Sequence, residues 1–328
     1  MSKIILVSGG AGYIGSHTVH MMKEKGYEVE VIDSLEKGHQ AALPSDVPCH
    51  IGRIGDDRFV EEIMQRSQFD GVLHFSGYIE VGESVLKPAK FIQNNLQEAI
   101  TFLDVCKQNG IKKFIFSSSA AVYGIPKRVP IKETFPKDPI NTYGVSKLAF
   151  EYVLESYAKA YNMTCVALRY FNAAGAAFGI GEDHNPETHL IPIVLQAALG
   201  QRPEMRIYGT DYETPDGTCI RDYIHIEDLA QAHILALEKS DIGFDAYNLG
   251  NGQGYSVKEI IETARDVTAK EIIAVPSSRR PGDPDRLIAD PTKAMQKLNW
   301  KPKRSLVEII LSAWKWHSNN PNGFESKD

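Results

Sequence analysis

The chain has 328 residues, of which 24% are charged and 43% are hydrophobic, and it carries a formal net charge of -6 at pH 7. This composition is that of a folded globular protein and excludes a disordered chain. The negative charge and the lack of long Lys/Arg runs argue against a nucleic-acid or anionic-membrane surface, and no apolar run is long enough to span a bilayer. We therefore expect no nucleic-acid partner and no membrane.

Four cysteines, Cys49, Cys106, Cys165 and Cys219, stand far apart and form no Cys-x-x-Cys pair. This spacing favours isolated structural thiols in a reducing compartment over a disulfide framework. The opening segment MSKIILVSGG passes into a strand-like run without a charged and then apolar leader. The sequence therefore predicts a cytoplasmic protein.

Strand-like and helix-like patterns alternate along the first half of the chain. The predicted strands are 4–8, 29–33, 72–75, 114–117 and 165–170, and the predicted helices are 13–25, 57–66, 88–109 and 142–161. Strands that are apolar on both faces and separated by helices indicate a parallel sheet with right-handed crossovers. We predict an α/β fold with a doubly wound parallel sheet, the Rossmann arrangement.

The pattern changes after Phe171, where a stretch rich in Gly, Asn and Pro predicts a long functional loop. The elements expected beyond it are helices at 190–199, 227–238, 257–267 and 306–317 and strands at 205–208, 220–226 and 246–249. We predict a cofactor-binding Rossmann domain of residues 1–172 plus about 220–248. A smaller, discontinuous C-terminal substrate domain would comprise 173–219 and 249–328.

Three glycines, Gly9, Gly12 and Gly15, lie between the first strand and the first helix. Such glycines permit a tight turn and let the backbone approach a pyrophosphate at the helix N-terminus. Asp33 ends the next strand, where a carboxylate accepts hydrogen bonds from a ribose diol and repels a 2'-phosphate. The motif predicts NAD rather than NADP as the cofactor.

Tyr143 and Lys147 are four residues apart on a predicted helix, which places them on one face. Tyr123 and Lys127 have the same spacing, but Pro126 between them forbids the helix. A tyrosine needs a pKa shift of about three units, or about 4 kcal/mol, to act as a base at neutral pH. A cation about 6 Å away supplies roughly 3 kcal/mol at an effective dielectric of about 20, so we expect Lys147 nearly to suffice.

Two histidines, His184 and His189, invite a metal site. Their spacing is five rather than the four of a helical His-Glu-x-x-His motif, Pro186 interrupts any helix between them, and no cysteine is near. We expect a loop ordered by hydrogen bonds and no metal.

The segments GGAGYIGSH, SSSAAVYG, YGVSK, LRYFN and RDYIH together resemble the extended short-chain dehydrogenase/reductase family and, within it, the UDP-glucose (UDP-galactose) 4-epimerases. The resemblance covers nearly the whole chain. It implies an NAD-dependent isomerase that interconverts UDP-galactose and UDP-glucose. NAD would transiently oxidise C4 to a 4-keto sugar, which rotates and takes the hydride back on its other face.

The resemblance also implies roles for individual residues. Tyr143 would take the proton of the 4-hydroxyl, Lys147 would hold the nicotinamide ribose and lower the tyrosine pKa, and Ser119 would bond the 4-oxygen. The implied cofactor residues are Gly9, Gly12, Tyr13, Ile14, Gly15, Asp33, Ser34, Ile54, Phe75, Ser76, Gly77, Asn94, Ser119, Tyr143, Lys147 and Phe171. The implied UDP-sugar residues are Asn172, His189, Leu190, Tyr208, Arg221, Arg280, Asp283 and Leu287.

Two departures from the family pattern concern the cofactor site. Arg53 stands where relatives carry an Asp that contacts adenine, so it would stack on adenine instead or attract a 2'-phosphate. Ile79 and Glu80 stand where many relatives carry a lysine, so we expect one cationic contact near the diphosphate to be missing.

Alternatives to this assignment remain open at the level of sequence. A dehydratase of the same fold would need an acid pair after Ser119, where Ala120 and Ala121 stand. A noncatalytic NAD-binding scaffold would not need Tyr143 and Lys147. A third alternative is a 4-epimerase for UDP-N-acetylhexosamines or UDP-pentoses, and a leucine near the sugar 2-substituent predicts moderate tolerance for N-acetylated sugars. Relatives are commonly homodimers, so helices 88–109 and 142–161 are the expected interface.

Overall fold

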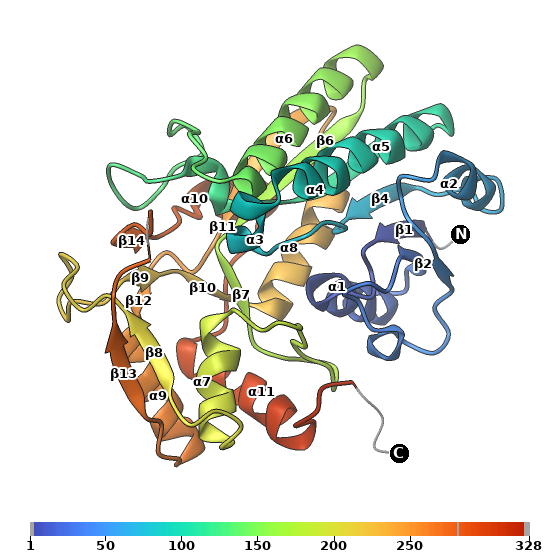
Figure 1. The fold of residues 1–328 in the computed structure, drawn as a ribbon. Helices are drawn as coiled ribbons and strands as arrows, with labels where there is room; N and C mark the ends of the chain where they lie inside the picture. The colour runs from blue at the N-terminus through green and yellow to red at the C-terminus, as the bar shows by residue number, and fades with distance from the viewer. Residues whose placement is uncertain (1–2, 281, 325–328) are drawn as a thin grey trace.

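The computed structural model describes residues 3–280 and 282–324, and its centre is a seven-stranded parallel sheet (Figure 1). The strand order is β11-β6-β5-β4-β1-β2-β3. The strands are β1 (Ile4–Ser8), β2 (Glu28–Asp33), β3 (Cys49–Ile51), β4 (Gly71–His74), β5 (Lys113–Ser119), β6 (Thr164–Tyr170) and β11 (Gly243–Leu249). From β1 the chain adds β2 and β3 on one side of the sheet and then β4, β5, β6 and β11 on the other. This is the predicted doubly wound arrangement.

Helices cover both faces of this sheet because its strands are apolar on both sides. In β1, Ile5 and Val7 face one hydrophobic core and Leu6 faces the other, as the two-residue period of a strand requires. The first face is covered by α1 (Tyr13–Glu24), α8 (Ile226–Lys239) and α10 (Thr292–Leu298). The second is covered by α2 (Asp57–Met64), α5 (Ala99–Gln108) and α6 (Thr142–Tyr161).

A smaller lobe lies beside the carboxyl edge of the sheet and has its own core (Figure 1). Its helices are α7 (Leu190–Ala198), α9 (Val257–Thr268) and α11 (Leu306–Asn319). The short strands are β7 (Asn172–Ala174), β8 (Met205–Tyr208), β9 (Ile220–Arg221), β10 (Tyr223–His225), β12 (Tyr255–Ser256), β13 (Ala274–Ser277) and β14 (Arg286–Leu287). None of the helices described in either lobe is long and apolar enough to cross a membrane.

The predicted strand at 220–226 is interrupted at Asp222. Its buried carboxylate accepts hydrogen bonds from the backbone N–H groups of Asn251, Gly252 and Ala289. This local fold therefore separates β9, which pairs with β12 and β14, from β10, which pairs with β7. The isolated Asp gave no sign of this role in the sequence.

The predicted helix at 88–109 consists of three segments, α4 (Pro88–Ile92), a π-helical segment η2 (Gln93–Glu98) and α5. The wider turn lets two consecutive side chains, Asn94 and Asn95, both accept a hydrogen bond from the N–H of Tyr78. A π turn of this kind often lies at a functional site. The short segments η1 (Gln40–Ala42), α3 (Val81–Leu86) and η3 (Ala120–Tyr123) complete the described elements.

A buried ion pair joins the sheet to α6. Arg169 of β6 donates through Nε to the Glu151 carboxylate at 2.9 Å, and the two side chains are 3% and 2% exposed. Ser118 donates to the same carboxylate at 2.6 Å, and Arg169 Nη1 donates to Tyr123 Oη at 2.8 Å. Every charge in this network therefore has a partner inside the protein.

We expect Glu151→Ala to lower the free energy of unfolding by about 3–5 kcal/mol, because it leaves the Arg169 guanidinium buried without its counter-ion. The matched control is Glu262→Ala, whose Arg265 partner is an exposed helical neighbour. This control should change stability by at most about 1 kcal/mol. Urea unfolding followed by circular dichroism measures both, and equal losses would contradict the assigned role of the buried pair.

Candidate active site

The glycine turn after β1 is packed too closely for side chains, and its backbone leads directly into α1. Gly9 has φ +72°, and a Cβ there would lie 2.5 Å from the Ser76 nitrogen; a Cβ on Gly15 would lie 2.2 Å from the Gly9 oxygen. The N-cap of α1, Gly12, has no side-chain cap, and the first turn has no acidic residue. The N–H groups of Tyr13, Ile14 and Gly15 are thus available to an anion, which fits a dinucleotide pyrophosphate.

Asp33 lies at the carboxyl end of β2 beside this turn. Its carboxylate accepts hydrogen bonds from the N–H groups of Ala11 and Leu35, each at 2.9 Å. Burial raises the pKa of Asp33, although these two hydrogen bonds oppose the shift. Ser34 follows it and accepts a hydrogen bond from Glu36 N at 3.4 Å, and Ile54 is buried behind the loop after β3.

Arg53 is paired with acidic side chains. It donates to Glu36 and, at 2.8 Å, to Glu98. Tyr78 Oη donates to the same Glu36 carboxylate at 2.6 Å. Two carboxylates thus surround the guanidinium that was expected to stack on adenine or attract a 2'-phosphate, and they disfavour a second phosphate there.

A lysine from another loop lies beside Glu80, one of the two residues that stand where many relatives carry a lysine. Lys37 Nζ lies 2.9 Å from Glu80 Oε1 and donates to the backbone oxygen of Asn185 at 2.9 Å. The contact joins the loops after β2 and β4 to the loop before α7. Lys37 is close in sequence to His39, whose N–H donates to Ala11 O of the glycine turn.

The end of β4 brings Phe75, Ser76 and Gly77 to the same edge of the sheet. Phe75 N donates to Ser8 O at 2.8 Å, and a Cβ on Gly77 would lie 3.6 Å from Lys147 Nζ. Asn95, which the sequence reasoning missed, is buried, and its amide donates to Tyr78 O at 2.9 Å. The only indication of Asn95 in the sequence was its neighbour Asn94, which the resemblance assigns to the cofactor. The π turn lets both side chains contact the loop at Tyr78.

Ser119, Tyr143 and Lys147 lie together between β5 and α6. Asn141 caps α6 by accepting from Gly144 N at 2.8 Å, and the helix places Tyr143 and Lys147 on one face. The Tyr143 hydroxyl is hydrogen-bonded to Ser119, and Lys147 Nζ lies 5.7 Å from the Tyr143 ring centre and donates to Ser117 O at 3.0 Å. The structure thus brings the three predicted catalytic residues into one group.

The pKa of Tyr143 bears on one expectation from the sequence. Burial raises this pKa above its ordinary value, and the Ser119 hydrogen bond only partly opposes the shift. Burial also lowers the pKa of Lys147 to about 8. The expectation that Lys147 and an oxidised nicotinamide together make the tyrosine a base did not include this loss of water around both groups, which opposes the effect of the lysine.

Several of the predicted substrate residues gather in the smaller lobe. Arg221 pairs with Asp283 and lies opposite Leu287 in the β9–β14 register. The Arg280 guanidinium lies 4.1 Å from the centre of the Tyr208 ring. Asn172 and Phe171 lie where β6 leads into β7: Asn172 donates to Asp222 O, and Phe171 packs with Leu287 on a small core.

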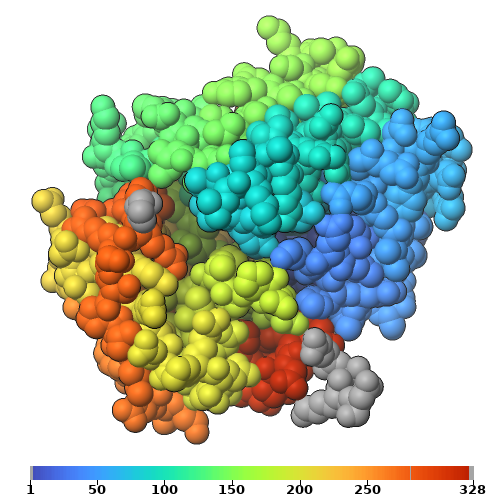
Figure 2. Space-filling view, viewed as in Figure 1, coloured from blue at the N-terminus to red at the C-terminus, as the bar shows by residue number. Residues whose placement is uncertain are grey.

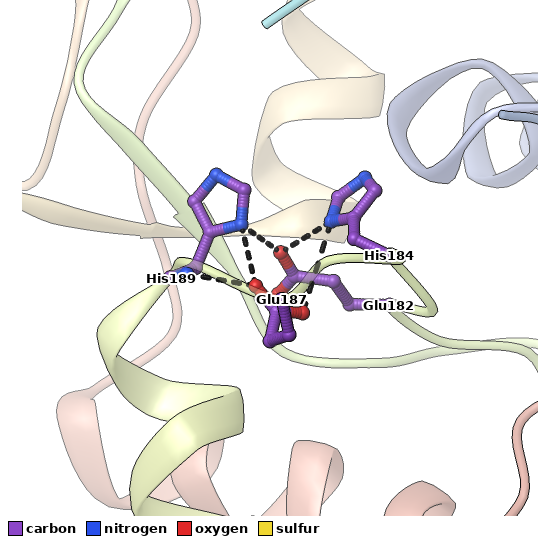
Figure 3. A group of neighbouring side chains, drawn as sticks. All are labelled: Glu182, His184, Glu187 and His189. Carbon is purple, nitrogen blue, oxygen red and sulfur yellow. Dashed lines mark hydrogen bonds and ion pairs between the residues drawn. The ribbon is translucent and has the colours of Figure 1, made fainter. Parts of the chain in front are cut away.

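His189 does not lie with these arginines in any described contact. It is the N-cap of α7, just before Leu190, and its Nδ1 lies 2.9 Å from both Glu182 and Glu187 (Figure 3). These carboxylates raise the pKa of His189 to about 10, against the effect of burial. His184 is nearby, with ring centres 5.1 Å apart. The sequence predicted a loop ordered by hydrogen bonds here, and His184 and His189 each lie within hydrogen-bond distance of a glutamate of this loop.

The candidate site lies between the two lobes. Figure 2 shows the surface hollowed where the teal segment around α3 and α4 faces the yellow-green segment before α7. The glycine turn, the ends of β4 and β5, and the start of α6 all belong to the carboxyl edge of the sheet (Figure 1). Ligands of doubly wound sheets bind at this edge.

A glycine turn open to phosphate, a carboxylate placed for a ribose and a buried Ser–Tyr–Lys group define the class, a dinucleotide-dependent enzyme that acts on a hydroxyl-bearing carbon. The family described as "NAD dependent epimerase/dehydratase family" matches residues 5–250. The chain belongs to this family, which confirms the resemblance found in its motifs.

Individual relatives match over the full length. A UDP-glucose 4-epimerase of Halalkalibacterium halodurans is 50% identical over 331 residues, covering 99% of each chain. A solved structure of a UDP-glucose 4-epimerase has 46% identity and a TM-score of 0.96, covering 99% of this chain and 100% of that one. The UDP-glucose 4-epimerase of Bifidobacterium longum, in complex with NAD+ and UDP, has 39% identity and a TM-score of 0.94, with coverage of 98% and 100%.

Gly15→Ala should abolish retention of the dinucleotide, because the added Cβ would collide with the Gly9 oxygen and displace the phosphate-binding turn. Gly82→Ala is the matched control, since a Cβ there meets nothing within 4 Å. The measurement is the cofactor content of each purified variant, read from absorbance after denaturation. Retention of cofactor by Gly15→Ala at the control's level would refute the role of the glycine turn in binding the dinucleotide.

Proposed function

We propose that this chain interconverts UDP-glucose and UDP-galactose by oxidising and re-reducing C4 of the sugar. The observation that carries the proposal is the group of half-buried Ser119 and buried Tyr143 and Lys147 at the sheet edge. The full-length similarity to UDP-glucose 4-epimerases supports the same reaction. NAD is the cofactor, since the family is NAD-dependent and Asp33 and the open α1 N-terminus fit a dinucleotide.

When bound, NAD supplies a hydride acceptor for C4 and then a donor to the opposite face. Tyr143 removes the proton of the 4-hydroxyl and returns it to the new 4-hydroxyl. Ser119, hydrogen-bonded to Tyr143, holds the sugar 4-oxygen. Lys147 donates to Ser117 O and keeps one positive charge near the phenol, where it favours the phenolate and holds the nicotinamide ribose.

The residues after Ser119 restrict the outcome. Ala120 and Ala121 begin η3 and offer no acid, and Ser119 itself accepts a hydrogen bond from Ala121 N at 3.1 Å. A 4-keto sugar held here meets no proton donor of the kind that eliminates water in a dehydratase. The remaining reaction is return of the hydride.

We assign the UDP-sugar to the smaller lobe. Arg221 and Arg280 hold the diphosphate, since guanidinium groups match phosphate oxygens. Asp283 pairs with Arg221 and fixes its direction. Leu287 packs against the same small core as Phe171, and we assign it to the sugar 2-substituent, where a leucine predicts moderate tolerance for N-acetylated sugars. The other assigned substrate residues are Asn172, His189, Leu190 and Tyr208.

Tyr143→Phe should abolish conversion of UDP-galactose to UDP-glucose, because it removes the proton acceptor without removing the ring. The variant should keep its circular dichroism spectrum and its bound NAD. Product separation after incubation with UDP-galactose, without added cofactor, measures the reaction. Wild-type turnover by the variant would refute the role of Tyr143.

A second prediction concerns the pKa of Tyr143. Because burial raises this pKa, the phenol in protein freed of cofactor should ionise at a higher pH than an exposed tyrosine does. Bound NAD, whose nicotinamide is positively charged, should lower the pKa. Ultraviolet difference titration of wild type against Tyr143→Phe measures this ionisation. A tyrosinate below pH 9 in the cofactor-free protein would contradict the dominant effect of burial.

We further propose that the Rossmann domain comprises residues 1–172 and about 220–248 and that the remainder forms the substrate domain. We also propose a reducing cytoplasmic location, in keeping with four free cysteines.

We also propose a homodimer through α6 and its neighbours. Val145 and Tyr152 on α6 are 41% and 52% exposed, and Leu86 of α3 is 82% exposed. Val145 and Tyr152 are seven residues apart and so lie on one face of α6, and exposed apolar side chains there favour a second copy as the partner.

Light scattering after size exclusion should give twice the chain mass for the wild type. Tyr152→Glu should shift it to one chain mass, because the substitution places a charge in an apolar interface. Ile242→Glu is the control, since Ile242 is also exposed, at 71%, but lies in the loop before β11. A wild-type monomer, or dissociation by the control alone, would exclude this interface.

A further inference from the structure

Four side chains converge in the loop between β7 and α7. Glu182, His184, Glu187 and His189 each contribute one donor atom, and these atoms all lie within 4.8 Å of one another. Figure 3 shows both imidazole rings turning Nδ1 toward the carboxylates. Of the four, only His189 is also among the residues assigned to the sugar nucleotide, and zinc binding would make its role there that of a fixed loop residue.

The separations are close to those between the ligands of one metal ion. With zinc–ligand bonds of about 2.0–2.2 Å, neighbouring donors of a tetrahedral site lie about 3.3–3.6 Å apart. His184 Nδ1 lies 3.1 Å from Glu182 Oε1 and 3.9 Å from Glu187 Oε2, and His189 Nδ1 lies 2.9 Å from Glu182 Oε1. The two shorter separations are those of hydrogen bonds, and each of the three must change by a few tenths of an ångström for the four donors to share an ion.

The charge of the group also calls for a cation. The Glu182 and Glu187 side chains are 5% and 4% exposed. Within 4 Å, their only ion-pair partners in the described part of the chain are the two histidines. Two buried carboxylates are costly unless a cation balances them. In the metal-free protein protonated His189 balances part of this charge, and a bound divalent ion would replace that proton.

Neighbouring groups hold the donors in place. Glu187 Oε1 accepts the N–H groups of Thr188 and His189, each at 2.7 Å, which leaves Oε2 turned toward His184. Hydrogen bonds of this kind orient the ligands of protein metal sites. His189 is 41% exposed, so an ion can enter from its side.

We propose that Glu182, His184, Glu187 and His189 bind one zinc ion as a structural site. Two imidazoles and two carboxylates neutralise a divalent ion and fill a tetrahedral shell, which leaves no position for a substrate. The ion fixes the loop at the start of α7 and beside Tyr13, whose ring lies 6.2 Å from that of His184. The proposal does not rest on the sugar reaction.

Metal content tests the site directly. Untagged wild-type protein, purified without chelator and dialysed against zinc and then buffer, should contain about one zinc per chain by plasma mass spectrometry. His184→Gln should contain less than about a tenth of that, because glutamine keeps a hydrogen-bond donor but is not a zinc ligand. His50→Gln is the matched control, since His50 also pairs with a glutamate, Glu30, at 2.7 Å, and should keep the zinc.

Stability gives a second readout that does not use activity. EDTA should lower the melting temperature of the wild type and of His50→Gln, and should speed hydrogen exchange in residues 182–190. It should leave the already lower melting temperature of His184→Gln unchanged. Wild-type protein that takes up no zinc, or equal zinc in His184→Gln and the wild type, would overturn the proposal in favour of a loop held by hydrogen bonds alone. Wild-type protein that binds zinc but does not convert UDP-galactose would instead refute the proposed function and leave the zinc site standing.

Discussion

The end of strand β5 is fastened to one face of α6, and the active-site geometry depends on this contact. Tyr143, Lys147 and Glu151 are spaced at four-residue intervals, so they form one stripe along the helix. The three consecutive serines of β5 each meet one member of the stripe. Ser119 bonds Tyr143, the backbone oxygen of Ser117 accepts from Lys147, and Ser118 donates to Glu151. Arg169 then ties Glu151 to β6.

This fastening explains why the catalytic side chains are so deeply buried, and burial sets their protonation. Tyr143 is 8% exposed and Lys147 is 3% exposed. Water that would stabilise phenolate and ammonium is excluded, so both pKa values move toward the neutral forms. Positive charge brought into the same low-dielectric space would oppose this effect of burial on the phenol. The proposed role of Tyr143 as a base therefore depends on charge that a bound cofactor supplies.

The sequence predicted the parts of the molecule that local pattern determines. The strand Ile4–Ser8 and the helix Thr142–Tyr161 have the expected bounds because apolar periodicity and the Asn141 cap define them. The buried pair of Glu151 and Arg169 was missed, since neither residue differs in sequence from a solvated surface charge. Glu182 and Glu187 were missed for a related reason: an irregular loop has no repeat from which convergence of side chains can be derived.

The segment between β7 and α7 connects the two halves of the site. Three contacts hold it to the nucleotide-binding side: Tyr13 Oη donates to Gly175 O at 2.6 Å, His39 Nε2 lies 3.1 Å from Asp183 O, and Lys37 donates to Asn185 O. At its other end, His189 caps α7 in the core of the smaller lobe. The same segment therefore borders the phosphate turn and begins the helix that carries Leu190. In the proposed function the sugar nucleotide lies across the same two lobes, so the contacts of this segment bear on how the proposed substrate residues are placed relative to Tyr143.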